Sequence, residues 1–446
     1  MASTTHPHAF HFDRAVDSYW EASADPLALA TPPLRGEARC EVAIIGAGFT
    51  GLSAALELAE AGVDVRVLEA GHVGWGASGR NGGFACIGSH KLPYERMIAT
   101  YGLDATKQYY AAMRQSVELV RDTLTRFAID AWASGDGEVT LAHLPGRVQE
   151  LKDEQAFLAR TFGDKTEFLP KEELKARGLD GPGFHAGLLG ATGFGIHPLN
   201  YVRGLARAAA GAGATIHGRS RLIRWEETQA GHRLHTAEGV LSARQVIVAT
   251  NGYTPEDVSR RHKGRIMPAL SSILVTRVLS GEERRAQGWT SPLMAYDSRK
   301  LLHYFRLLPN GRFLFGGRGG TDASDQGATD YRPVLEGAFR QLFPAWAEVE
   351  ITHYWRGFVC LAYDLVPYIG PLDEKQTVWT AIAYHGNGVA MGSWSGRAVA
   401  RLAMKKAARD ELSPVLTRRL AMFPLPAFRP LYLKGAYVWY GWQDGR

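Results

Sequence analysis

Cysteine is scarce in this sequence of 446 residues. The three cysteines are Cys40, Cys86 and Cys360, and no two of them form a CxxC pair. An odd and sparse set of this kind argues against a disulfide framework and against a zinc site, so we expect no metal. It fits a reducing compartment, and we therefore expect a cytoplasmic protein.

The chain also lacks a concentration of charge of one sign. Lys and Arg number 51 and Asp and Glu number 45, which gives a net charge of +6, and no run of five or six like charges occurs. Binding to nucleic acid or to a membrane surface would need a concentrated basic face. We expect neither partner.

No segment has the uninterrupted apolar character of a membrane span. The most apolar long window, residues 42–62, contains Glu57, Glu60 and several glycines. The N-terminal residues MASTTHPHAFHFDR have no apolar core and no cleavage signal. We therefore expect no membrane span and no export.

What is present is typical of a globular protein, because 46% of the residues are hydrophobic and the length favours two domains. Residues 42–45 and 63–68 are apolar runs typical of buried parallel strands, with a helix-forming segment at 51–61 between them. Residues 245–249 predict another buried strand. Residues 378–407 predict a strand, a glycine turn and a helix.

A different pattern covers residues 271–317. Three apolar or alternating runs (ILVTRVL, LLHYFRLL and GRFLFGG), with PNG as a turn, predict an inserted, mainly antiparallel sheet. Residues 104–130 and 147–178 predict helices on either side of a strand at 139–144. Residues 196–218 predict a helix, a glycine break and a strand.

The two ends of the chain differ from this body. Residues 1–37 form a polar extension interrupted by prolines, which is typical of a mobile arm, although Tyr19 and Trp20 indicate a point of docking. The last residues, 430–446, form an aromatic tail. We predict no internal repeat.

The first apolar run leads into GAGFTG, a GxGxxG motif at Gly46, Gly48 and Gly51. The motif alone is weak evidence, but here it links a strand to a helix, and Glu69 closes the next strand. Gly46 permits the turn, Gly48 lets a pyrophosphate approach, and Gly51 lets helix and strand pack closely. The helix start attracts phosphates, and Glu69 can accept hydrogen bonds from a ribose but would repel a 2′-phosphate. The motif predicts FAD or NAD in a Rossmann-type domain.

A second glycine-rich loop, GWGASGRNGGFACIG at residues 74–88, distinguishes these two cofactors. A nicotinamide dehydrogenase has no need of it, whereas FAD extends across the sheet and its ring needs a second cradle. Ser78, Arg80 and Asn81 can pass close to the pyrophosphate, the ribityl chain or the ring edge, flanked by Gly79, Gly82 and Gly83. A flexible surface loop is the alternative interpretation.

A third glycine segment, HGNGV at residues 385–389, follows a predicted strand and precedes a helix. The helix start would aim Gly388 and the next backbone N–H groups at the N1–C2=O edge of a flavin, which becomes negative on reduction. An ordinary helix cap is the alternative interpretation.

Together these segments resemble the D-amino-acid-oxidase-like family of FAD-dependent amine oxidoreductases. The resemblance rests on VAIIGAGFTGLSAALELAEAG, VRVLEA, GASGRNGG, HPLNYVRGLARAA, QVIVATNGYTP and DLVPYIG followed by HGNGV. SYWEAS, LLHYFRLLPNGRFLFGG and YVWYGWQDGR are most similar to the gamma-glutamylputrescine oxidase branch.

The resemblance implies two domains. A discontinuous FAD-binding domain of the glutathione-reductase-like, Rossmann type is expected from residues 38–95, 195–262 and 355–408. A substrate domain built on the antiparallel sheet is expected from residues 96–194 and 263–354. The extension 1–37 and the tail 409–446 flank them.

It also implies the residues that bind FAD. They are expected in the glycine turn and the end of the second strand (Gly46, Gly48, Phe49, Thr50, Gly51, Glu69 and Ala70), in the second loop (Gly76, Ala77, Ser78, Arg80, Asn81, Gly82 and Gly83), after strand 245–249 (Thr250, Asn251 and Gly252) and in the third segment (Gly386, Asn387, Gly388 and Val389). Some members tether the flavin through a cysteine. Cys360 lies closer to Asp364 than that tether would, so we expect non-covalent FAD.

The implied reaction passes a hydride from the carbon next to an amine nitrogen to flavin N5. The imine then hydrolyses, and O2 reoxidises the flavin to give H2O2. His385 is the leading titratable candidate, either as a base or as an orienting group. Arg306 or Arg318 could pair with a substrate carboxylate, and Trp355 is one of the aromatic residues expected near the site, with Tyr304, Phe305, Phe358 and Tyr384.

Three alternatives stay open at this point. The first is an FAD-dependent dehydrogenase that passes electrons to a quinone or a partner protein. The second is a nicotinamide-dependent dehydrogenase, and the third is a flavoprotein that modifies or binds nucleic acid. The sequence leaves the amine and the oligomeric state open.

Overall fold

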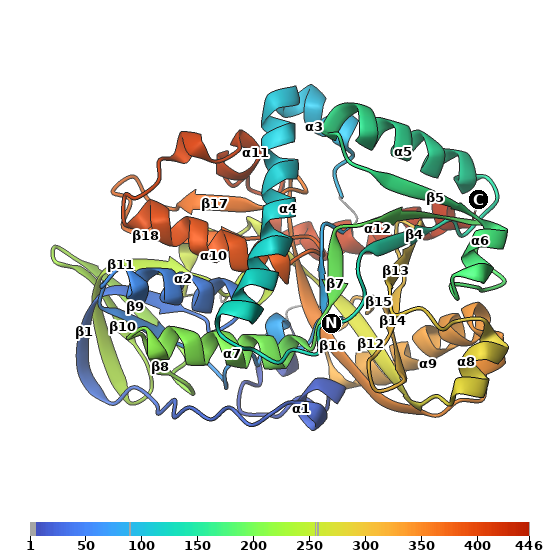
Figure 1. Cartoon of the computed structure of the whole chain (residues 1–446). Coiled ribbons are helices and arrows are strands. Elements are labelled where there is room, and N and C mark those ends of the chain that lie inside the picture. The colour runs from blue at the N-terminus through green and yellow to red at the C-terminus, as the bar shows by residue number, and fades with distance from the viewer. Residues whose placement is uncertain (1–5, 89–90, 255, 257, 446) are drawn as a thin grey trace.

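Two eight-stranded sheets lie next to each other in the computed structural model, which describes residues 6–88, 91–254, 256 and 258–445. In Figure 1 the first sheet forms the left half and the second sheet the right half. A small third sheet pairs β3 (Phe84–Cys86) with β7 (Gly193–Gly195). The chain passes between the two halves several times.

The first sheet is built around β1 (Gly36–Ile45), whose last residues are the apolar run read from the sequence. β1 pairs in parallel with β2 (Val65–Leu68) and β11 (Gly239–Val248), and these pair with β8 (Thr215–His217) and β18 (Val378–Ile382). The antiparallel strands are β17 (Tyr368–Pro371), β10 (Gly231–His235) and β9 (Arg224–Thr228). The order β17-β18-β11-β1-β2-β8 agrees with the predicted Rossmann-type domain.

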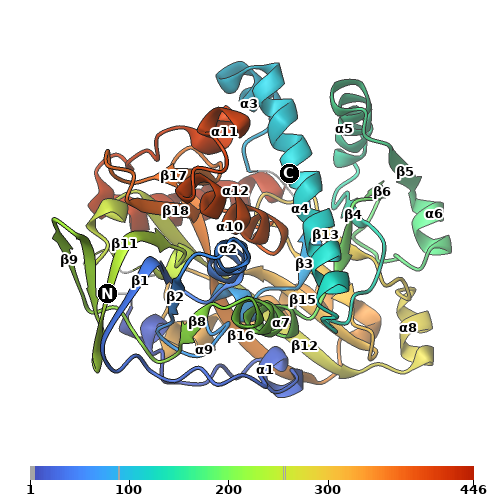
Figure 2. The ribbon, with the colours of Figure 1, turned by 60° about the vertical axis from the view of Figure 1, so that its left-hand side comes forward.

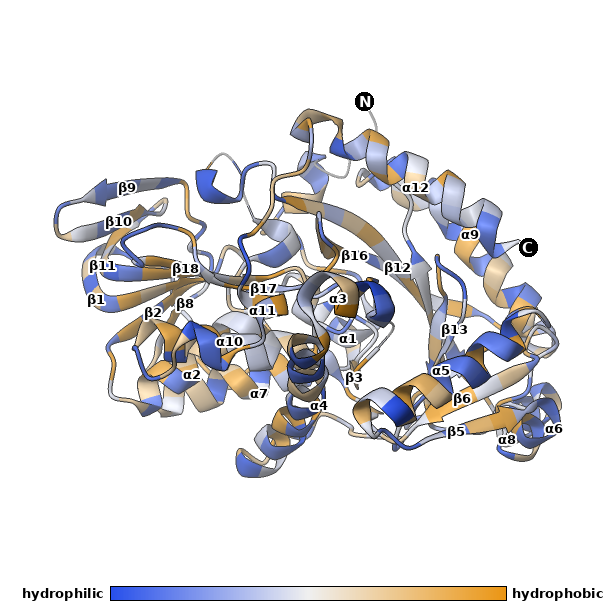
Figure 3. Cartoon of the chain, turned by 90° about the horizontal axis from the view of Figure 1, so that it is seen from above, coloured by the Kyte–Doolittle hydropathy of each residue, from blue (hydrophilic) through white to orange (hydrophobic). Residues whose placement is uncertain are grey.

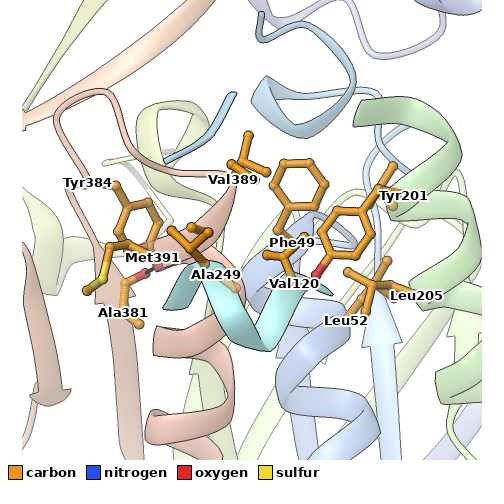
Figure 4. Close-up of a cluster of buried hydrophobic side chains, with 14 of the residues drawn as sticks. Phe49, Leu52, Val120, Tyr201, Leu205, Ala249, Ala381, Tyr384, Val389 and Met391 are labelled. Atoms are coloured by element: carbon orange, nitrogen blue, oxygen red, sulfur yellow. Dashed lines mark hydrogen bonds between the residues drawn. The ribbon is translucent and has the colours of Figure 1, made fainter. Parts of the chain in front are cut away.

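Helices cover this sheet and bury their apolar sides against it. In Figure 2, α2 (Phe49–Glu60) is seen end-on between α10 (Ala390–Ala403) and α7 (Pro198–Gly211), and it packs on both. Figure 4 shows part of the shared core, in which Phe49 and Leu52 of α2 lie beside Tyr201 and Leu205 of α7. The long α4 (Leu103–Arg126), preceded by α3 (Tyr94–Tyr101), packs against α10.

The second sheet has the order β16-β12-β15-β14-β13-β4-β6-β5. Its strands are β16 (Ile351–Ala362), β12 (Ile266–Val278), β15 (Arg312–Arg318), β14 (Tyr304–Leu307), β13 (Met294–Asp297), β4 (Glu138–Leu141), β6 (Ala186–Gly190) and β5 (Thr166–Pro170). All its pairings are antiparallel except that of β13 with β4. The predicted antiparallel sheet, including the PNG turn between β14 and β15, is confirmed.

The two faces of the second sheet differ because side chains alternate along a strand. On β14, Phe305 and Leu307 join an aromatic core with Phe343 and Trp346, beneath α9 (Asp325–Leu342) and beside α8 (Gly281–Gln287). Tyr304 and Arg306 therefore point to the opposite face, toward the first half of the molecule.

One prediction of secondary structure needs correction. The region 147–178 is not one helical segment, because β5 separates α5 (Arg147–Phe162) from α6 (Lys171–Ala176). Its run TEFLP pairs with β6 and so completes the edge of the second sheet. The aromatic tail, for which no secondary structure was predicted, forms α12 (Arg429–Asp444) after the short α11 (Pro414–Thr417).

The N-terminal extension docks where the sequence indicated, although its first five residues lie outside the described part. Tyr19 and Trp20 open α1 (Tyr19–Ser23), and both are buried. The Trp20 indole N–H donates to the carbonyl oxygen of Asn81 at 2.8 Å, so the extension holds the second glycine loop.

The extent of β16 and the packing of α4 can be compared with the predicted domain boundaries. β16 belongs to the second sheet as far as Ala362, whereas the third FAD segment was placed from residue 355. α4 lies in a region assigned to the substrate domain but packs on α10. In the described part of the chain, no helix is long and apolar enough to span a membrane.

Candidate active site

A single cavity reaches from the end of β1 to the inner face of the second sheet. Most of the residues predicted to bind cofactor or substrate line it: Gly46, Gly48, Phe49, Thr50, Glu69, Ala70, Gly76, Ala77, Ser78, Arg80, Asn81, Gly82, Thr250, Asn251, Arg318, His385, Gly386, Gly388 and Val389. Six do not line it: Gly51, Gly83, Gly252, Asn387, Arg306 and Trp355.

The glycine turn leaves backbone open where β1 meets α2. Gly46 has φ +105°, which favours glycine, and a Cβ on Gly51 would lie 1.9 Å from the Gly46 carbonyl oxygen. Gly48 is the N-cap of α2 and has no side chain to cover the helix start. Gly51 therefore supports the turn from behind, while Gly46 and Gly48 face the cavity.

Glu69 fastens this turn from the end of β2. Its carboxylate accepts hydrogen bonds from the N–H groups of Ala47 at 2.8 Å and Gly71 at 2.9 Å. Burial raises the pKa of Glu69, and these two N–H groups oppose the rise. Each oxygen keeps a lone pair for a further donor in the cavity.

The second glycine loop is a rigid structure held by its own side chains. Ser78 Oγ accepts from the N–H of Phe49 at 3.0 Å, which joins the loop to the start of α2. Asn81 donates to the carbonyl oxygens of Ala77 and Ser78 and accepts from the N–H of Gly83. The flexible surface loop is thus not what the structure contains.

Arg80 is held in the same loop. Its Nε donates to the Trp75 carbonyl oxygen at 2.8 Å, and its guanidinium lies 4.0 Å from the centre of the Trp75 ring. A fixed positive charge therefore lines the middle of the cavity.

Trp355 and Arg306 support this loop from outside the cavity, so neither is placed to contact a substrate in it. The Trp355 indole N–H donates to the Arg80 carbonyl oxygen at 2.9 Å. Arg306 is 1% exposed and donates to the carbonyl oxygens of Gly82 and Ile196. Burial lowers the pKa of Arg306 to about 9. The sequence could not separate Arg306 from Arg318, because both lie on strands of the same sheet.

The segment after β11 is fixed to the third glycine segment. Asn251, at φ +45°, accepts from the N–H of Ala383 through its side-chain oxygen at 3.0 Å. A Cβ on Gly252 would lie 2.9 Å from Cβ of Phe358, so this glycine allows close packing and not ligand contact.

His385 lies in the third glycine segment with φ +57°, an uncommon value for a residue with a side chain. Its Nε2 accepts from the N–H of Ala362 at 3.1 Å, which assigns the proton to Nδ1. That Nδ1 is buried and has no partner among the described residues. Burial, with the charges of Arg418 and Lys91, lowers the pKa of His385 to about 3. His385 thus presents a neutral N–H and no free lone pair, which favours the orienting role over the base.

Asn387 holds this segment against the loop at Gly88. Its amide N–H donates to the Ile87 carbonyl oxygen at 3.1 Å, while its Oδ1 is buried with no partner in the described part of the chain. The unpartnered N–H of His385 and the unpartnered Oδ1 of Asn387 thus lie two residues apart in the third glycine segment. Of the two residues, only His385 lines the cavity.

The far end of the cavity is aromatic and basic. Tyr304 and Phe358 line it from the second sheet, whereas Phe305 faces the opposite core. Tyr384 lines the cavity beside the glycine turn, where its hydroxyl bonds to Thr50 Oγ1 at 2.8 Å. Arg318, at the end of β15, lines the same end, and its guanidinium has no hydrogen bond or ion pair among the described residues.

Several residues that line the cavity were not among those predicted from the sequence. Phe10 and Phe12 reach the cavity from the extension, where their alternation in AFHF could have indicated it. Lys91 and Tyr296 line the far end. Cys360 also lines the cavity, and burial raises the pKa of its thiol, so the protonated form is favoured.

The arrangement fits FAD. The open backbone at Gly46 and Gly48 and the uncapped start of α2 suit a pyrophosphate, and Glu69 suits a ribose. His385 lines the cavity, and its unpartnered Nδ1–H suits an acceptor atom at the polar edge of a flavin ring. In the described part of the chain, no cluster of His, Cys, Asp and Glu could hold a metal ion.

Comparison with known proteins agrees with this geometry. The family profile described as "FAD dependent oxidoreductase" (DAO) matches residues 41–402. The chain is 30% identical to a probable oxidoreductase OrdL of Rhizobium meliloti over 95% of this chain and 97% of that protein. It is also 30% identical to the gamma-glutamylputrescine oxidoreductase of Escherichia coli, over 93% of this chain and 94% of that protein.

Solved structures share the fold. Glycine oxidase from Geobacillus kaustophilus superposes with a TM-score of 0.69 at 22% identity, over 86% of this chain and 100% of that chain. L-proline dehydrogenase from P. horikoshii gives a TM-score of 0.67 at 20% identity, over 86% of this chain and 96% of that chain.

Proposed function

This chain belongs to the FAD-dependent oxidoreductase family, and on that premise we propose that it oxidises an amine at the carbon next to the nitrogen. The single observation that carries the proposal is the continuous cavity, because it joins the glycine turn of the first sheet to the aromatic, basic end of the second. When bound, FAD supplies the two-electron acceptor for the hydride of that carbon.

The aromatic walls prepare the amine for this reaction. An alkyl amine in water has a pKa of about 10.4, yet only its neutral form has a lone pair to assist hydride loss. A pocket walled by the aromatic rings of Tyr304 and Phe358 disfavours the cation and lowers that pKa. Water then hydrolyses the imine product to a carbonyl compound and releases ammonia or an amine.

Arg318 is the residue that we assign to a carboxylate on the substrate. It lines the far end, carries a permanent charge and has no partner among the described residues. A gamma-glutamylputrescine-like amine has both the amine and the carboxylate. This choice also draws on the E. coli relative, whose printed name contains gamma-glutamylputrescine.

The backbone network orients the site. His385 donates its Nδ1–H toward the cofactor, and Trp355 and Arg306 position the second glycine loop. We propose that FAD is held without a covalent bond, since burial favours the protonated thiol of Cys360 over the nucleophilic thiolate. Release of FAD into the supernatant on acid precipitation tests this.

Anaerobic mixing tests the proposed function. Yellow holoenzyme is mixed with a panel of amines, gamma-glutamylputrescine first, and loss of the flavin absorbance is followed. Bleaching by that compound supports the substrate assignment, and bleaching only by another amine moves it to that amine. If no amine bleaches the flavin, the proposal fails.

Reoxidation by O2 with release of H2O2 is part of the proposal. The second candidate, a dehydrogenase that passes electrons to a quinone or a partner protein, has the L-proline dehydrogenase fold neighbour in its favour. Peroxide formed in proportion to amine consumed supports the oxidase. A reduced flavin that persists in air until a quinone is added supports the dehydrogenase.

A further inference from the structure

The N-terminal extension lies against the cavity before it reaches α1. Phe10 and Phe12 are half-buried and line the cavity, whereas His11 and Asp13, which alternate with them, are exposed. The family profile begins at residue 41, so these two rings come from outside the segment that the profile matches. In Figure 3 the N-terminus lies at the same edge of the molecule as α9.

Phe12 lies at the nucleotide end of the cavity. Its ring centre is 4.7 Å from that of Trp75, and the guanidinium of Arg221 lies 5.2 Å from the centre of the Phe12 ring. A Cβ on Gly71 would lie 3.0 Å from the Phe12 carbonyl oxygen, so this glycine lets the segment approach the end of β2 closely. Arg221 and Glu69 both line the cavity, and Phe12 therefore belongs to its wall at the place that suits a ribose.

Phe10 continues the same wall toward the second sheet. Its ring centre lies 6.0 Å from that of Phe358 on β16 and 6.2 Å from that of Tyr253, which follows β11. Together with Trp75, these two residues belong to one hydrophobic cluster, on which Phe10 and Phe12 pack. Since β11 is a strand of the first sheet and β16 a strand of the second, the segment contacts both halves of the molecule.

Polar contacts hold the segment beyond the second ring. The Trp75 indole N–H donates to the Arg14 carbonyl oxygen at 2.9 Å. Nη1 of Arg14 donates to both carboxylate oxygens of Asp325, at 3.2 and 3.0 Å, at the start of α9. This ion pair is exposed and contributes little by itself, so the packing of the two rings supplies most of the stability of the docked segment.

We propose that the segment 7–14 belongs to the FAD site: Phe10 and Phe12 form a wall over bound FAD, which leaves the cavity only after the segment undocks. Aromatic rings suit this place because they present a large apolar surface to a planar ligand at a low cost in side-chain freedom. The inference rests on FAD as the cofactor and is independent of the amine that is oxidised.

The rate of FAD release tests this wall. Holoenzyme is diluted without amine, and the fluorescence of released FAD is followed for the unchanged chain, Phe12→Ala, Phe10→Ala and His11→Ala. His11 is the matched control, because it lies between the two rings but is exposed and does not line the cavity. We expect each Phe variant to release FAD about tenfold faster, the contribution of a half-buried ring, and His11→Ala to leave the rate unchanged.

Proteolysis of the unchanged chain is a second test, which does not depend on whether a variant folds. If the two rings contact bound FAD, then FAD in turn holds the segment in place, because coupling between two sites is reciprocal. Trypsin cuts after Arg14, whose carbonyl oxygen is bonded to Trp75 in the docked segment. We expect this cut to be about tenfold slower in the holoenzyme than in the protein freed of FAD, the same factor as for release. In the double variant Phe10→Ala, Phe12→Ala, the two rates should be equal.

Three results would overturn the inference: an unchanged rate of FAD release in both Phe variants, an equal rise in His11→Ala, or equal trypsin rates with and without FAD. The Tm of each variant without FAD is also measured, since a purely structural segment would lower this Tm and leave FAD release unchanged. None of these measurements uses an amine, so their outcome is separate from that of the proposed function.

Discussion

The two ends of the cavity differ in how their polar groups are used. At the nucleotide end, the side chains of Ser78, Arg80 and Asn81 hydrogen-bond to the protein backbone, and the Glu69 carboxylate accepts from two backbone N–H groups. At the far end, Tyr304 and Ser271 bond to each other, but the guanidinium of Arg318 has no hydrogen bond or ion pair in the described part of the chain.

This contrast separates two kinds of binding. We propose that the cofactor is held by a rigid backbone whose side chains already have hydrogen-bond partners, so that its recognition depends on glycines and on the helix start. A substrate is recognised by polar groups that have no partner in its absence, and leaving such groups unpaired costs free energy. Variants of the two ends should therefore fail in different ways.

The largest expected effect comes from closing the glycine turn. Gly51→Ala places a Cβ 1.9 Å from the Gly46 carbonyl oxygen, which forces β1 and α2 apart. Overpacking of this kind costs about 1–3 kcal/mol, and we expect purified protein with little bound FAD and a lower Tm. Gly211→Ala is the control, because nothing lies within 4 Å of its added Cβ. Full FAD content in Gly51→Ala would contradict the account of the turn.

Arg318→Met should spare the cofactor and harm the substrate. Loss of one partner of a buried charge pair costs about 2–5 kcal/mol, so kcat/KM for gamma-glutamylputrescine is expected to fall about thirtyfold or more. The FAD content should stay unchanged, as measured by absorbance. An equal loss for the α-methyl ester of that substrate would show that Arg318 does not recognise the carboxylate.

The pH dependence of carboxylate binding sharpens the same contrast. Burial, with the charges of Arg318 and Lys300, lowers the pKa of Lys91 to about 7, whereas Asp444 and Asp297 oppose this. Lys91 is a cation below that pH and neutral above it, so the Kd of pentanoate, which has a carboxylate and no amine, should rise as the pH increases through 7. Calorimetry between pH 6 and 8 measures this, and in Lys91→Met the rise should disappear.

The smallest effect is expected from Trp355→Phe. The substitution removes one hydrogen bond to the Arg80 carbonyl oxygen and keeps the aromatic packing. We expect a loss of about 0.5–1.5 kcal/mol in unfolding free energy and weaker FAD retention, with the substrate's half-saturating concentration unchanged. A change in the half-saturating concentration of the substrate alone would contradict this account, because it would assign Trp355 to the substrate end of the cavity.

Sequence patterns were sufficient where local chemistry decides the structure. The glycines of GAGFTG and the alternation around the PNG turn predict a strand-turn-helix and an antiparallel sheet, and both are confirmed. That the second loop cradles the cofactor stays a prediction, and Gly83 in that loop has φ +72°, which favours glycine.

Contacts between distant segments could not be predicted in this way. Arg306 and Arg318 have the same surroundings in the sequence, but only the fold places one beneath the loop and the other in the cavity. In the sequence, Tyr437 is one of several aromatic residues of the tail. Only the structure shows that this tail forms the helix α12, which is anchored at both ends. The residues of β5 were predicted to be helical, because their strand structure depends on pairing with β6.

The central claim is that a hydride leaves the carbon next to the amine in the space between the two sheets. Its most direct test is anaerobic rapid mixing of the holoenzyme with gamma-glutamylputrescine carrying either hydrogen or deuterium at that carbon. The account predicts that the flavin is reduced and that deuterium slows the limiting rate of reduction. Reduction at the same rate with both compounds, or a flavin that stays oxidised, would contradict it.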